Sequence, residues 1–279
     1  MISGNAKLAG VVGWPIAHSL SPALHGYWIA EHKLDAAYLP LAVRAEDFAD
    51  VFRVLPKAGF RGFNVTLPHK EAAFALVDTH DDAARATGAV NTVVFENGRA
   101  HGRNTDAHGF SALLRESGVA KLDGVRAVVL GAGGASRAVI AALLSLGAAE
   151  VALVNRTVDK AEALAKRFGA RVTAMDWSSL PKVLGGAGVV ANTTSLGMSG
   201  QPPLELDLAP LPGTAVVVDI VYRPLETPLL ARAKARGLKA IDGLGMLLHQ
   251  AQPGFAAWFG VTPAVTPALR AHLIAQLGR

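Results

Sequence analysis

The sequence predicts an α/β protein with two domains, one of which is a doubly wound, Rossmann-like sheet that binds a dinucleotide. Short apolar segments rich in β-branched residues alternate with segments of helical periodicity along most of the 279 residues. A glycine-rich turn begins at Gly131, where one predicted strand gives way to a helix. Small polar motifs follow several other strands, at the sheet edge where open α/β folds bind ligands.

The N-terminal third reads as an α/β layer with a mostly parallel sheet. Its expected strands are 7–13, 36–43 and 60–66, and its expected helices are 21–34 and 45–58. In the first helix we expect Ser21 to act as N-cap and Pro22 to occupy the first helical position.

A second pattern of strands and helices begins after "GRNTDAHGFSALLRESG", at residues 102–118. Its expected strands are 124–130, 150–155, 187–193, 214–221 and 237–242. The closing segment is helical in pattern and is expected to return to the first domain. We therefore predict a catalytic substrate domain made of 1–106 and 243–279, and a nucleotide-binding domain made of 107–242.

Composition limits the possible partners. Hydrophobic residues make up 51% of the chain and charged residues 18%, which suits a packed interior. The net charge is +5, but Lys and Arg are scattered and aromatic residues reach only 6%, which favours an anionic small ligand over nucleic acid. The absence of cysteine excludes disulfides and thiolate catalysis, and the nine histidines lack metal-ligand spacing, so we expect no metal site.

The chain carries no pattern that predicts membrane insertion. Its N-terminus lacks the basic-then-apolar order of a signal peptide, and its longest apolar runs are too short to span a bilayer. We therefore expect a soluble, cytoplasmic protein with no membrane partner.

The turn "GAGGASRA" predicts a dinucleotide site. Gly131, Gly133 and Gly134 allow a tight turn and a close backbone approach, so that the following helix N-terminus can receive a pyrophosphate. The third small position of the usual motif is Ser136, a mild departure. A tight strand–helix turn without a ligand is the alternative, but the flanking strands favour the nucleotide.

The end of the second strand indicates which nucleotide is bound. An NAD site usually carries Asp or Glu there to hold the ribose hydroxyl, whereas this chain has "NRTVDK", with Asn155, Arg156, Thr157 and Lys160. A guanidinium in place of a carboxylate favours a 2′-phosphate, so the sequence predicts NADP.

Four polar motifs lie outside the nucleotide domain: "GWPIAHSLSPALH", "NVTLPHK", "GAVNT" and "GRNTDAHG". Together they offer hydroxyls, amides and charges at expected strand ends, from Ser19, Ser21, Thr66, Lys70, Asn91 and Asp106. Such a set suits a small, polyhydroxylated, carboxylated substrate, because ligand hydroxyls need matched donors and acceptors.

With these motifs in this order, the chain resembles the shikimate dehydrogenase family. The resemblance covers essentially the whole length and includes "SLSP", "NVTLPHK", "NTDAHG", "GAGGASRA", "NTTSLGM", "DIVYRPLETPLL" and "GLGMLLHQA". It implies reversible NADPH-linked reduction of 3-dehydroshikimate to shikimate, in the pathway that leads to chorismate and the aromatic amino acids. It leaves monomer and homodimer both open.

The resemblance also implies roles for individual residues. Ser19 and Ser21 would meet the substrate carboxylate, and Tyr222 would lie near the ring. The ring hydroxyls would be held by Thr66, Asn91, Asp106 and Gln250. The cofactor would contact Gly131, Ala132, Gly133, Gly134 and Ala135, the segment from Asn155 to Lys160, and backbone near Ile220 and Gly243.

One departure from the family pattern is visible. The family commonly has His-Asn after "SPxx", whereas this chain has His25 and Gly26 after "SPAL". The pair lies on the expected helix, so the departure bears on local helix packing.

A ketone that accepts a hydride needs a proton donor at its oxygen, and a positioned lysine ammonium can supply it. We expect Lys70 to act as general acid and base, with Asp106 orienting it and also capping the helix that follows. His18, His25, His69 and His249 are expected to be structural, and the acidic segment 79–86 to be a solvated helix start.

Two alternatives stay open on sequence grounds. The first is a quinate/shikimate dehydrogenase that uses NAD, which Arg156 and Thr157 argue against. The second is a catalytically silent NADP-binding homologue, which should have lost part of the polar set. The lysine, the aspartate and both serines are all present.

Overall fold

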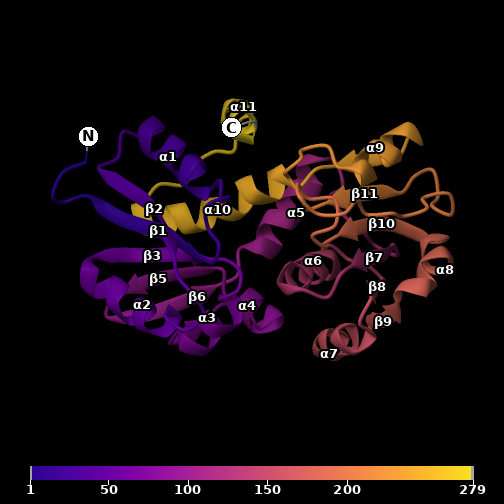
Figure 1. Ribbon diagram of the computed structural model, residues 1–279, viewed down its shortest axis with the longest axis horizontal. Helices are drawn as coiled ribbons and strands as arrows, with labels where there is room; N and C mark the ends of the chain where they lie inside the picture. The colour runs from indigo at the N-terminus through magenta and orange to yellow at the C-terminus, as the bar shows by residue number, and fades with distance from the viewer. Residues whose placement is uncertain (1, 278–279) are drawn as a thin grey trace. The chain divides into compact units, whose positions relative to one another are not determined.

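The chain folds into two compact units, described by a computed structural model for residues 2–277 (Figure 1). The first unit runs to Gly109 and resumes at Leu247, and the second is Phe110–Met246. The chain passes from one unit to the other inside two helices, α5 (Asp106–Glu116) and α10 (Leu244–Phe259).

A six-stranded sheet forms the centre of the first unit, in the order β2-β1-β3-β5-β6-β4. Its strands are β1 (Lys7–Gly13), β2 (Ala36–Ala42), β3 (Phe60–Val65), β4 (Thr79–His80), β5 (Thr92–Glu96) and β6 (Arg99–Arg103). β1 is parallel to β2 and β3, and β4 is parallel to β6, whereas β5 is antiparallel to both of its neighbours.

Helices cover both faces of this sheet. They are α1 (Ser21–Glu31), α2 (Phe48–Val54), the 3₁₀ turn η1 (Leu55–Ala58), α3 (Lys70–Leu76), α4 (Asp82–Thr87) and α11 (Pro267–Leu277), together with α10. On one face, His25 of α1 stacks on Tyr38 of β2. On the other, Phe52 of α2 meets Phe63 of β3 edge to face in a buried apolar cluster.

The C-terminal helices belong to the first unit, as expected. The indole nitrogen of Trp258 in α10 donates to the carbonyl of Val93 at 2.9 Å, which fixes the helix on the sheet. The indole nitrogen of Trp28 in α1 donates to the carbonyl of Ala264 at 3.0 Å, just before α11. In Figure 1 the yellow end of the chain accordingly lies beside the indigo α1.

The second unit contains a six-stranded sheet in the order β12-β11-β10-β7-β8-β9, with every neighbouring pair parallel. Its strands are β7 (Arg126–Leu130), β8 (Glu150–Asn155), β9 (Val172–Asp176), β10 (Ala187–Asn192), β11 (Val216–Asp219) and β12 (Lys239–Ile241). Its helices are α6 (Gly134–Ser145), α7 (Val158–Phe168), η2 (Trp177–Ser179), α8 (Leu180–Leu184) and α9 (Pro228–Ala235), besides α5.

Strand order reverses between β7 and β10, which is the switch point where doubly wound sheets bind ligands. The predicted α/β class with a Rossmann-like second domain is therefore confirmed. Within residues 2–277, no helix combines the length and the apolar character needed to cross a membrane.

Three strand features were not predicted, and one is β4, which occupies the first two residues of the segment 79–86 that was expected to be a helix start. The strand β9 is short and half-exposed, so it lacks the apolar run by which the other strands were recognised. β5 and β6 form a hairpin through Asn97 and Gly98, both at positive φ (52° and 72°). An Asn-Gly pair is a strong hairpin signal, and it would have located this turn.

The predicted capping roles of two residues are wrong. The N-cap of α1 is Leu20, and Ser21 is the first helical residue; its N–H donates to the Ser19 hydroxyl oxygen at 3.3 Å. Asp106 is likewise the first residue of α5, and its carboxylate contacts side chains from other elements. α1 also ends at Glu31, three residues before the expected end.

Gly26 is exposed in the middle of α1, and a Cβ placed on it would meet nothing within 4 Å. The departure at this position therefore leaves the packing of the helix unchanged. We predict that Gly26→Ala raises the free energy of unfolding by about 0.5–1 kcal/mol, because alanine loses less backbone entropy in a helix. Urea unfolding measures the change.

Gly59 is the matched control, because a Cβ there would also meet nothing within 4 Å but its φ is +84°. Gly59→Ala should destabilise the protein, because alanine is strained in the left-handed region. Equal effects of the two substitutions would contradict the explanation.

His25 is fully buried, and burial lowers its pKa from 6.5 to about 3, against the opposing effect of Asn64. The unfolded chain therefore binds a proton between pH 6.5 and 3 that the folded chain does not bind. We predict that stability falls through this window as the pH is lowered, by up to about 1.4 kcal/mol per pH unit from this group.

The His25→Phe variant isolates that contribution in urea unfolding measured from pH 7 to pH 4. Neither ring nitrogen of His25 has a hydrogen-bond partner of normal geometry among the described residues, so the substitution leaves no donor unpaired. The wild type should lose more stability than the variant as the pH falls. Parallel pH profiles would refute the assignment.

Candidate active site

An ion pair between Lys70 and Asp106 is the central feature of the polar cluster in the first unit. The Lys70 Nζ donates to Asp106 Oδ2 at 2.5 Å, and the two side chains are only 16% and 11% exposed. Lys70 begins α3 directly after the β3 turn, and Asp106 begins α5 directly after β6. Folding therefore joins two sequence motifs, each of which starts a helix after a strand.

Asn91 connects this ion pair to its surroundings. Its side-chain nitrogen donates to Asp106 Oδ1 at 2.7 Å and to the Thr105 hydroxyl at 3.0 Å. Its side-chain oxygen accepts from the Thr105 backbone N–H at 2.8 Å. The same nitrogen lies 3.5 Å from Gln250 Oε1, which brings α10 to the cluster. Lys70, Asn91, Asp106 and Gln250 thus form one hydrogen-bonded cluster.

Ser19, Ser21 and Thr66 follow strands that end at the same edge of the sheet. The loop that carries Ser19 follows β1 and leads to Ser21 at the start of α1, and Thr66 follows the neighbouring parallel strand β3. The Thr66 N–H donates to Val12 at 2.9 Å, which ties the two strand ends together. A Cβ on Gly13 would lie 2.4 Å from the Thr66 methyl carbon, so only glycine leaves room for this threonine. These residues approach from the carboxyl ends of β1 and β3.

Sequence reasoning missed the groups that hold the cluster. Thr92 is fully buried and donates to Asn91 Oδ1 at 3.0 Å, and Asn64 donates to the Asn91 carbonyl at 3.1 Å. Asn64 lies in "NVTLPHK" and Thr105 in "GRNTDAHG". A polar residue next to a predicted substrate-binding residue was the signal that could have identified them. The partner of Asn64, Tyr38, carries no such signal.

The predicted nucleotide turn lines a hollow in the second unit. The hollow has a volume of about 580 Å³. We call it the nucleotide hollow. It is lined by Gly131, Ala132, Gly133, Asn155, Arg156, Thr157, Lys160, Trp177, Thr193, Thr194, Ser195, Leu196, Gln201 and Pro202. They follow β7, β8, β9 and β10, so the hollow lies at the carboxyl edge around the switch point.

The glycines in this turn have distinct structural reasons. Gly131 has φ +98°, and a Cβ there would lie 2.9 Å from the Thr194 methyl carbon. A Cβ on Gly133 or Gly134 would meet nothing within 4 Å, so both leave open space at the start of α6. Ser136, the departure from the usual motif, is fully buried and donates to the Gly133 carbonyl, so it is satisfied within the helix.

The charges in the nucleotide hollow fit an anion. Arg156 and Lys160 are exposed, and no ion pair to a carboxylate of the described chain is formed by either. The strand-end carboxylate in register with Asn155, Asp176 of β9, accepts from the Ser178 N–H at 2.7 Å, and hydrogen bonds with Ser178 lower its pKa. The hollow therefore offers cations where an NAD site offers a carboxylate, which suits a 2′-phosphate.

A buried carboxylate holds one wall of this hollow. Asp219, fully buried at the end of β11, accepts from Asn192 at 2.9 Å, Val221 at 3.0 Å and Thr227 at 2.7 Å. Burial raises its pKa, and the hydrogen bonds oppose that shift, Thr227 first. Asn192 in turn accepts from the Thr194 N–H at 3.0 Å, so Asp219 fixes the loop against which Gly131 packs.

The remaining predicted residues lie in the second unit. Gly134 and Ala135 start α6 beside the nucleotide hollow. A Cβ on Gly243 would lie 2.2 Å from the Ile220 carbonyl oxygen, so the backbones at these two positions pack closely. Tyr222 follows them after β11, and burial raises its pKa. Within residues 2–277, no three His, Cys, Asp or Glu side chains gather to hold a metal ion.

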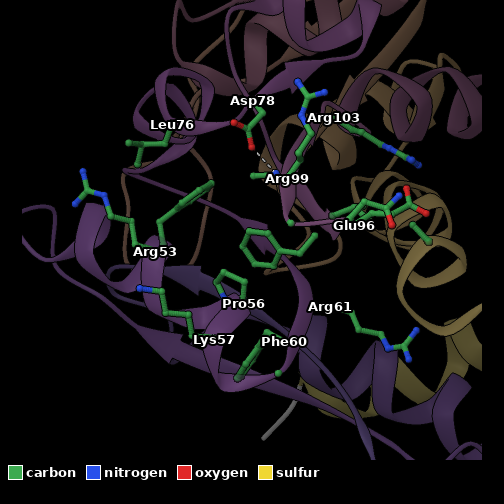
Figure 2. A pocket seen from close by; sticks show the side chains of 18 of the residues that line it. Arg53, Pro56, Lys57, Phe60, Arg61, Leu76, Asp78, Glu96, Arg99 and Arg103 are labelled. Atoms are coloured by element: carbon green, nitrogen blue, oxygen red, sulfur yellow. Dashed lines mark hydrogen bonds between the residues drawn. The ribbon is translucent and has the colours of Figure 1, made fainter.

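A separate, larger hollow of about 1110 Å³ occupies another part of the first unit. Figure 2 shows basic side chains around it, from Arg53, Lys57, Arg61, Arg99 and Arg103, over an apolar floor that includes Phe60. It is lined by the start of β3 and the turn between β5 and β6, whereas Lys70 and Asn91 flank the other ends of β3 and β5. None of the predicted site residues lines it.

One unit has a parallel sheet with a nucleotide turn at its switch point, and the other has a buried lysine–aspartate pair. Together in one chain, these features define a two-domain α/β dehydrogenase.

The comparisons with known proteins agree with this class. Residues 11–93 match the shikimate dehydrogenase substrate binding domain, and residues 114–199 match the family described as shikimate / quinate 5-dehydrogenase. The chain is 54% identical to the shikimate dehydrogenase (NADP(+)) of Rhodospirillum rubrum, over 99% of this chain and 100% of that protein.

Solved structures agree as well. The shikimate 5-dehydrogenase of Thermus thermophilus in complex with NADP(H) and shikimate has a TM-score of 0.86 at 39% identity, covering 97% of this chain and 99% of that one. The quinate dehydrogenase of Corynebacterium glutamicum in complex with NAD has a TM-score of 0.89 at 32% identity, covering 97% and 99%. The chain belongs to the shikimate dehydrogenase family, and the resemblance inferred from its motifs is confirmed.

Proposed function

We propose that this chain is an NADP-dependent oxidoreductase that catalyses the reversible reduction of 3-dehydroshikimate to shikimate. Family membership supports the reaction, and the buried Lys70–Asp106 pair is the observation in this molecule that carries it. An ammonium held out of water beside a carboxylate is a proton donor of defined position, which ketone reduction requires.

NADP, which the turn at Gly131 and the segment from Asn155 to Lys160 would hold, would supply or accept a hydride when bound. As the carbonyl π bond breaks, the ketone oxygen gains negative charge and takes a proton from the Lys70 Nζ. In the reverse direction neutral Lys70 removes the hydroxyl proton. Asp106 holds the Lys70 Nζ through Oδ2, while Asn91 occupies its other oxygen and fixes the orientation of the carboxylate.

The predicted substrate contacts become part of this proposal. We assign the substrate carboxylate to Ser19 and Ser21, which approach from the end of β1. The ring hydroxyls fall to Thr66, Asn91, Asp106 and Gln250, of which the last three share one hydrogen-bonded cluster. Tyr222 is assigned to the substrate from the second unit.

The nucleotide assignment rests on the hollow in the second unit. We assign the pyrophosphate to the turn from Gly131 to Ala135, the 2′-phosphate to the segment from Asn155 to Lys160, and backbone contacts to Ile220 and Gly243. Residues 1–106 and 243–279 then form the catalytic domain and 107–242 the nucleotide-binding domain. The compact units change over a few residues later, within α5 and α10.

The proposal includes a cytoplasmic enzyme that acts on a small molecule as a monomer or a homodimer. Light scattering on the purified protein distinguishes the two assemblies.

Quinate oxidation with NAD is the second candidate, because a quinate dehydrogenase in complex with NAD shares this fold. The cations of the nucleotide hollow favour NADP instead. The decisive measurement compares kcat/KM for shikimate and quinate, each with NADP and with NAD. A higher efficiency on quinate, or with NAD, would overturn the proposal, and no turnover of either substrate would support a silent homologue.

Arg156→Ala should raise the KM for NADP by roughly 10- to 100-fold, because one charge-assisted hydrogen bond to the phosphate is lost. The KM for NAD should stay unchanged, since NAD lacks that phosphate. Lys166→Ala is the control: Lys166 is an exposed cation on α7, which also carries Lys160, and it does not line the nucleotide hollow. Equal losses with both nucleotides would refute the role of Arg156.

Lys70→Ala should lower kcat by roughly 10²- to 10⁴-fold with a modest change in the KM for shikimate, because it removes the proton donor. Steady-state kinetics with shikimate and NADP measure both parameters. Lys57→Ala, an exposed lysine of the same unit, should behave as wild type. An unchanged kcat in Lys70→Ala would exclude Lys70 from catalysis.

A further inference from the structure

Tyr38 places a hydroxyl group inside the core of the first unit. The residue lies on β2 and is 7% exposed, and its hydroxyl donates to the side-chain oxygen of Asn64 at 2.6 Å. A phenylalanine would pack in the same space without the cost of burying a hydroxyl. The hydrogen bond that the hydroxyl makes to Asn64 explains why a tyrosine occupies this position.

Small residues clear the path between Tyr38 and Asn64, which are two strands apart. Tyr38 of β2 is in register with Ala9 of β1, and Ala9 is in register with Gly62 of β3. Asn64 lies two residues beyond Gly62, on the same face of the sheet. A long side chain at position 9 would occupy the space that the tyrosine ring crosses.

Asn64 uses every bonding group of its amide. Its oxygen accepts from Tyr38, and its nitrogen donates to the Asn91 carbonyl at 3.1 Å and to the Thr92 hydroxyl at 3.0 Å. The Thr92 hydroxyl donates to Asn91 Oδ1 at 3.0 Å. Asn64 therefore holds Asn91 by its backbone and, through Thr92, by its side chain.

The chain of hydrogen bonds ends at the catalytic pair. Asn91 donates to Asp106 Oδ1 at 2.7 Å, and Asp106 Oδ2 accepts from Lys70. The residues in between are almost completely buried: Asn64 is 6% exposed, Thr92 0% and Asn91 3%. Buried hydrogen bonds of this kind polarise and rigidify one another.

The other side of Tyr38 faces α1, the helix that carries Ser21. The His25 ring stacks on the Tyr38 ring with centroids 3.9 Å apart and planes 5° from parallel. Burial raises the pKa of Tyr38 well above its ordinary value, and a hydrogen bond with the Ser21 side chain opposes that shift. Tyr38 thus packs against the helix that carries Ser21 and is linked through Asn64 to the Lys70–Asp106 pair.

We propose that Tyr38 is a positioning residue for catalysis, which holds Asn64 in place and through Asn64 sets the orientation of Asn91 and Asp106. It touches neither the substrate nor the cofactor. Removing its hydroxyl leaves the Asn64 oxygen buried without its partner, so the amide loses the restraint that fixes its rotation. The inference rests on the proposed function for its kinetic consequence, but not for the hydrogen-bond chain itself.

The first test is Tyr38→Phe, which keeps the ring and its stack on His25. We expect kcat/KM for shikimate to fall roughly 10- to 100-fold, because small misplacements of catalytic groups cost that much. The KM for NADP should stay unchanged. Tyr27→Phe is the matched control, since Tyr27 is on the same helix as His25 but its ring meets His272 of α11. An unchanged kcat/KM in Tyr38→Phe would overturn the proposal.

A double-mutant cycle separates positioning from general loosening of the core. If Tyr38 acts through Asn64, adding Tyr38→Phe to Asn64→Ala should lower kcat/KM by less than about twofold further. Losses that multiply as independent effects would overturn the proposed route. If Asn64→Ala does not fold, the single variant and the next measurement still decide.

Hydrogen exchange of the side-chain amide protons of Asn64 and Asn91, followed by NMR, tests the inference without any activity. The protons should be protected in the wild type and in Tyr27→Phe, and should exchange at least tenfold faster in Tyr38→Phe. Equal protection in all three proteins would overturn the proposal. A wild type that is inactive on shikimate would refute the proposed function alone, because the exchange result stands without it.

Discussion

The buried ion pair between Lys70 and Asp106 imposes the constraint on which the first unit is built. Two charges removed from water are tolerated only when their remaining bonding groups are also satisfied, and breaking such a pair by removing one partner typically costs about 3–5 kcal/mol. The second carboxylate oxygen of Asp106 is accordingly met by Asn91, and Asn91 is held by Thr92, Thr105 and Asn64. The polar interior of this unit is the support that a buried charged pair requires.

That support is possible because strand ends and helix starts converge. Thr66 follows β3, Asn91 precedes β5, and Asp106 follows β6, so the antiparallel hairpin delivers its two polar ends to the same edge of the sheet as the parallel strands. Small residues then allow close approach. Gly13 makes room for Thr66, and Gly62 makes room for Trp258, since a Cβ there would lie 2.2 Å from the indole nitrogen.

The second unit also contains a buried carboxylate, that of Asp219, whose hydrogen-bonding groups must be satisfied. Asp219 has no cationic partner within its hydrogen-bond set and is satisfied by an amide, a backbone N–H and a hydroxyl. It joins the segment after β11 to the end of β10, and so shapes the loop that packs on Gly131. Arg156 and Lys160 are exposed at the nucleotide hollow, where a charged ligand can pair with them.

The sequence by itself determined the class of fold, the family and most of the residues that form the cluster. The strands 7–13 and 150–155 were predicted to the residue, because buried parallel strands are continuous apolar runs. Lys70, Asn91, Asp106 and Gln250 were named from their motifs, and the structure brings them together. The weak strand β9 and the hairpin at Asn97 were missed, the first because only one of its five residues is buried and the second because its Asn-Gly turn was overlooked.

Only the tertiary structure decided which groups satisfy one another. Ser21 and Asp106 look like N-caps in sequence, because capping is a local pattern, yet both begin their helices, and the Asp106 carboxylate bonds residues up to 36 positions away. The bond between Tyr38 and Asn64 depends on the register of three neighbouring strands and on the small size of Ala9. Strand register is set by packing of the whole sheet, so no local pattern contains it.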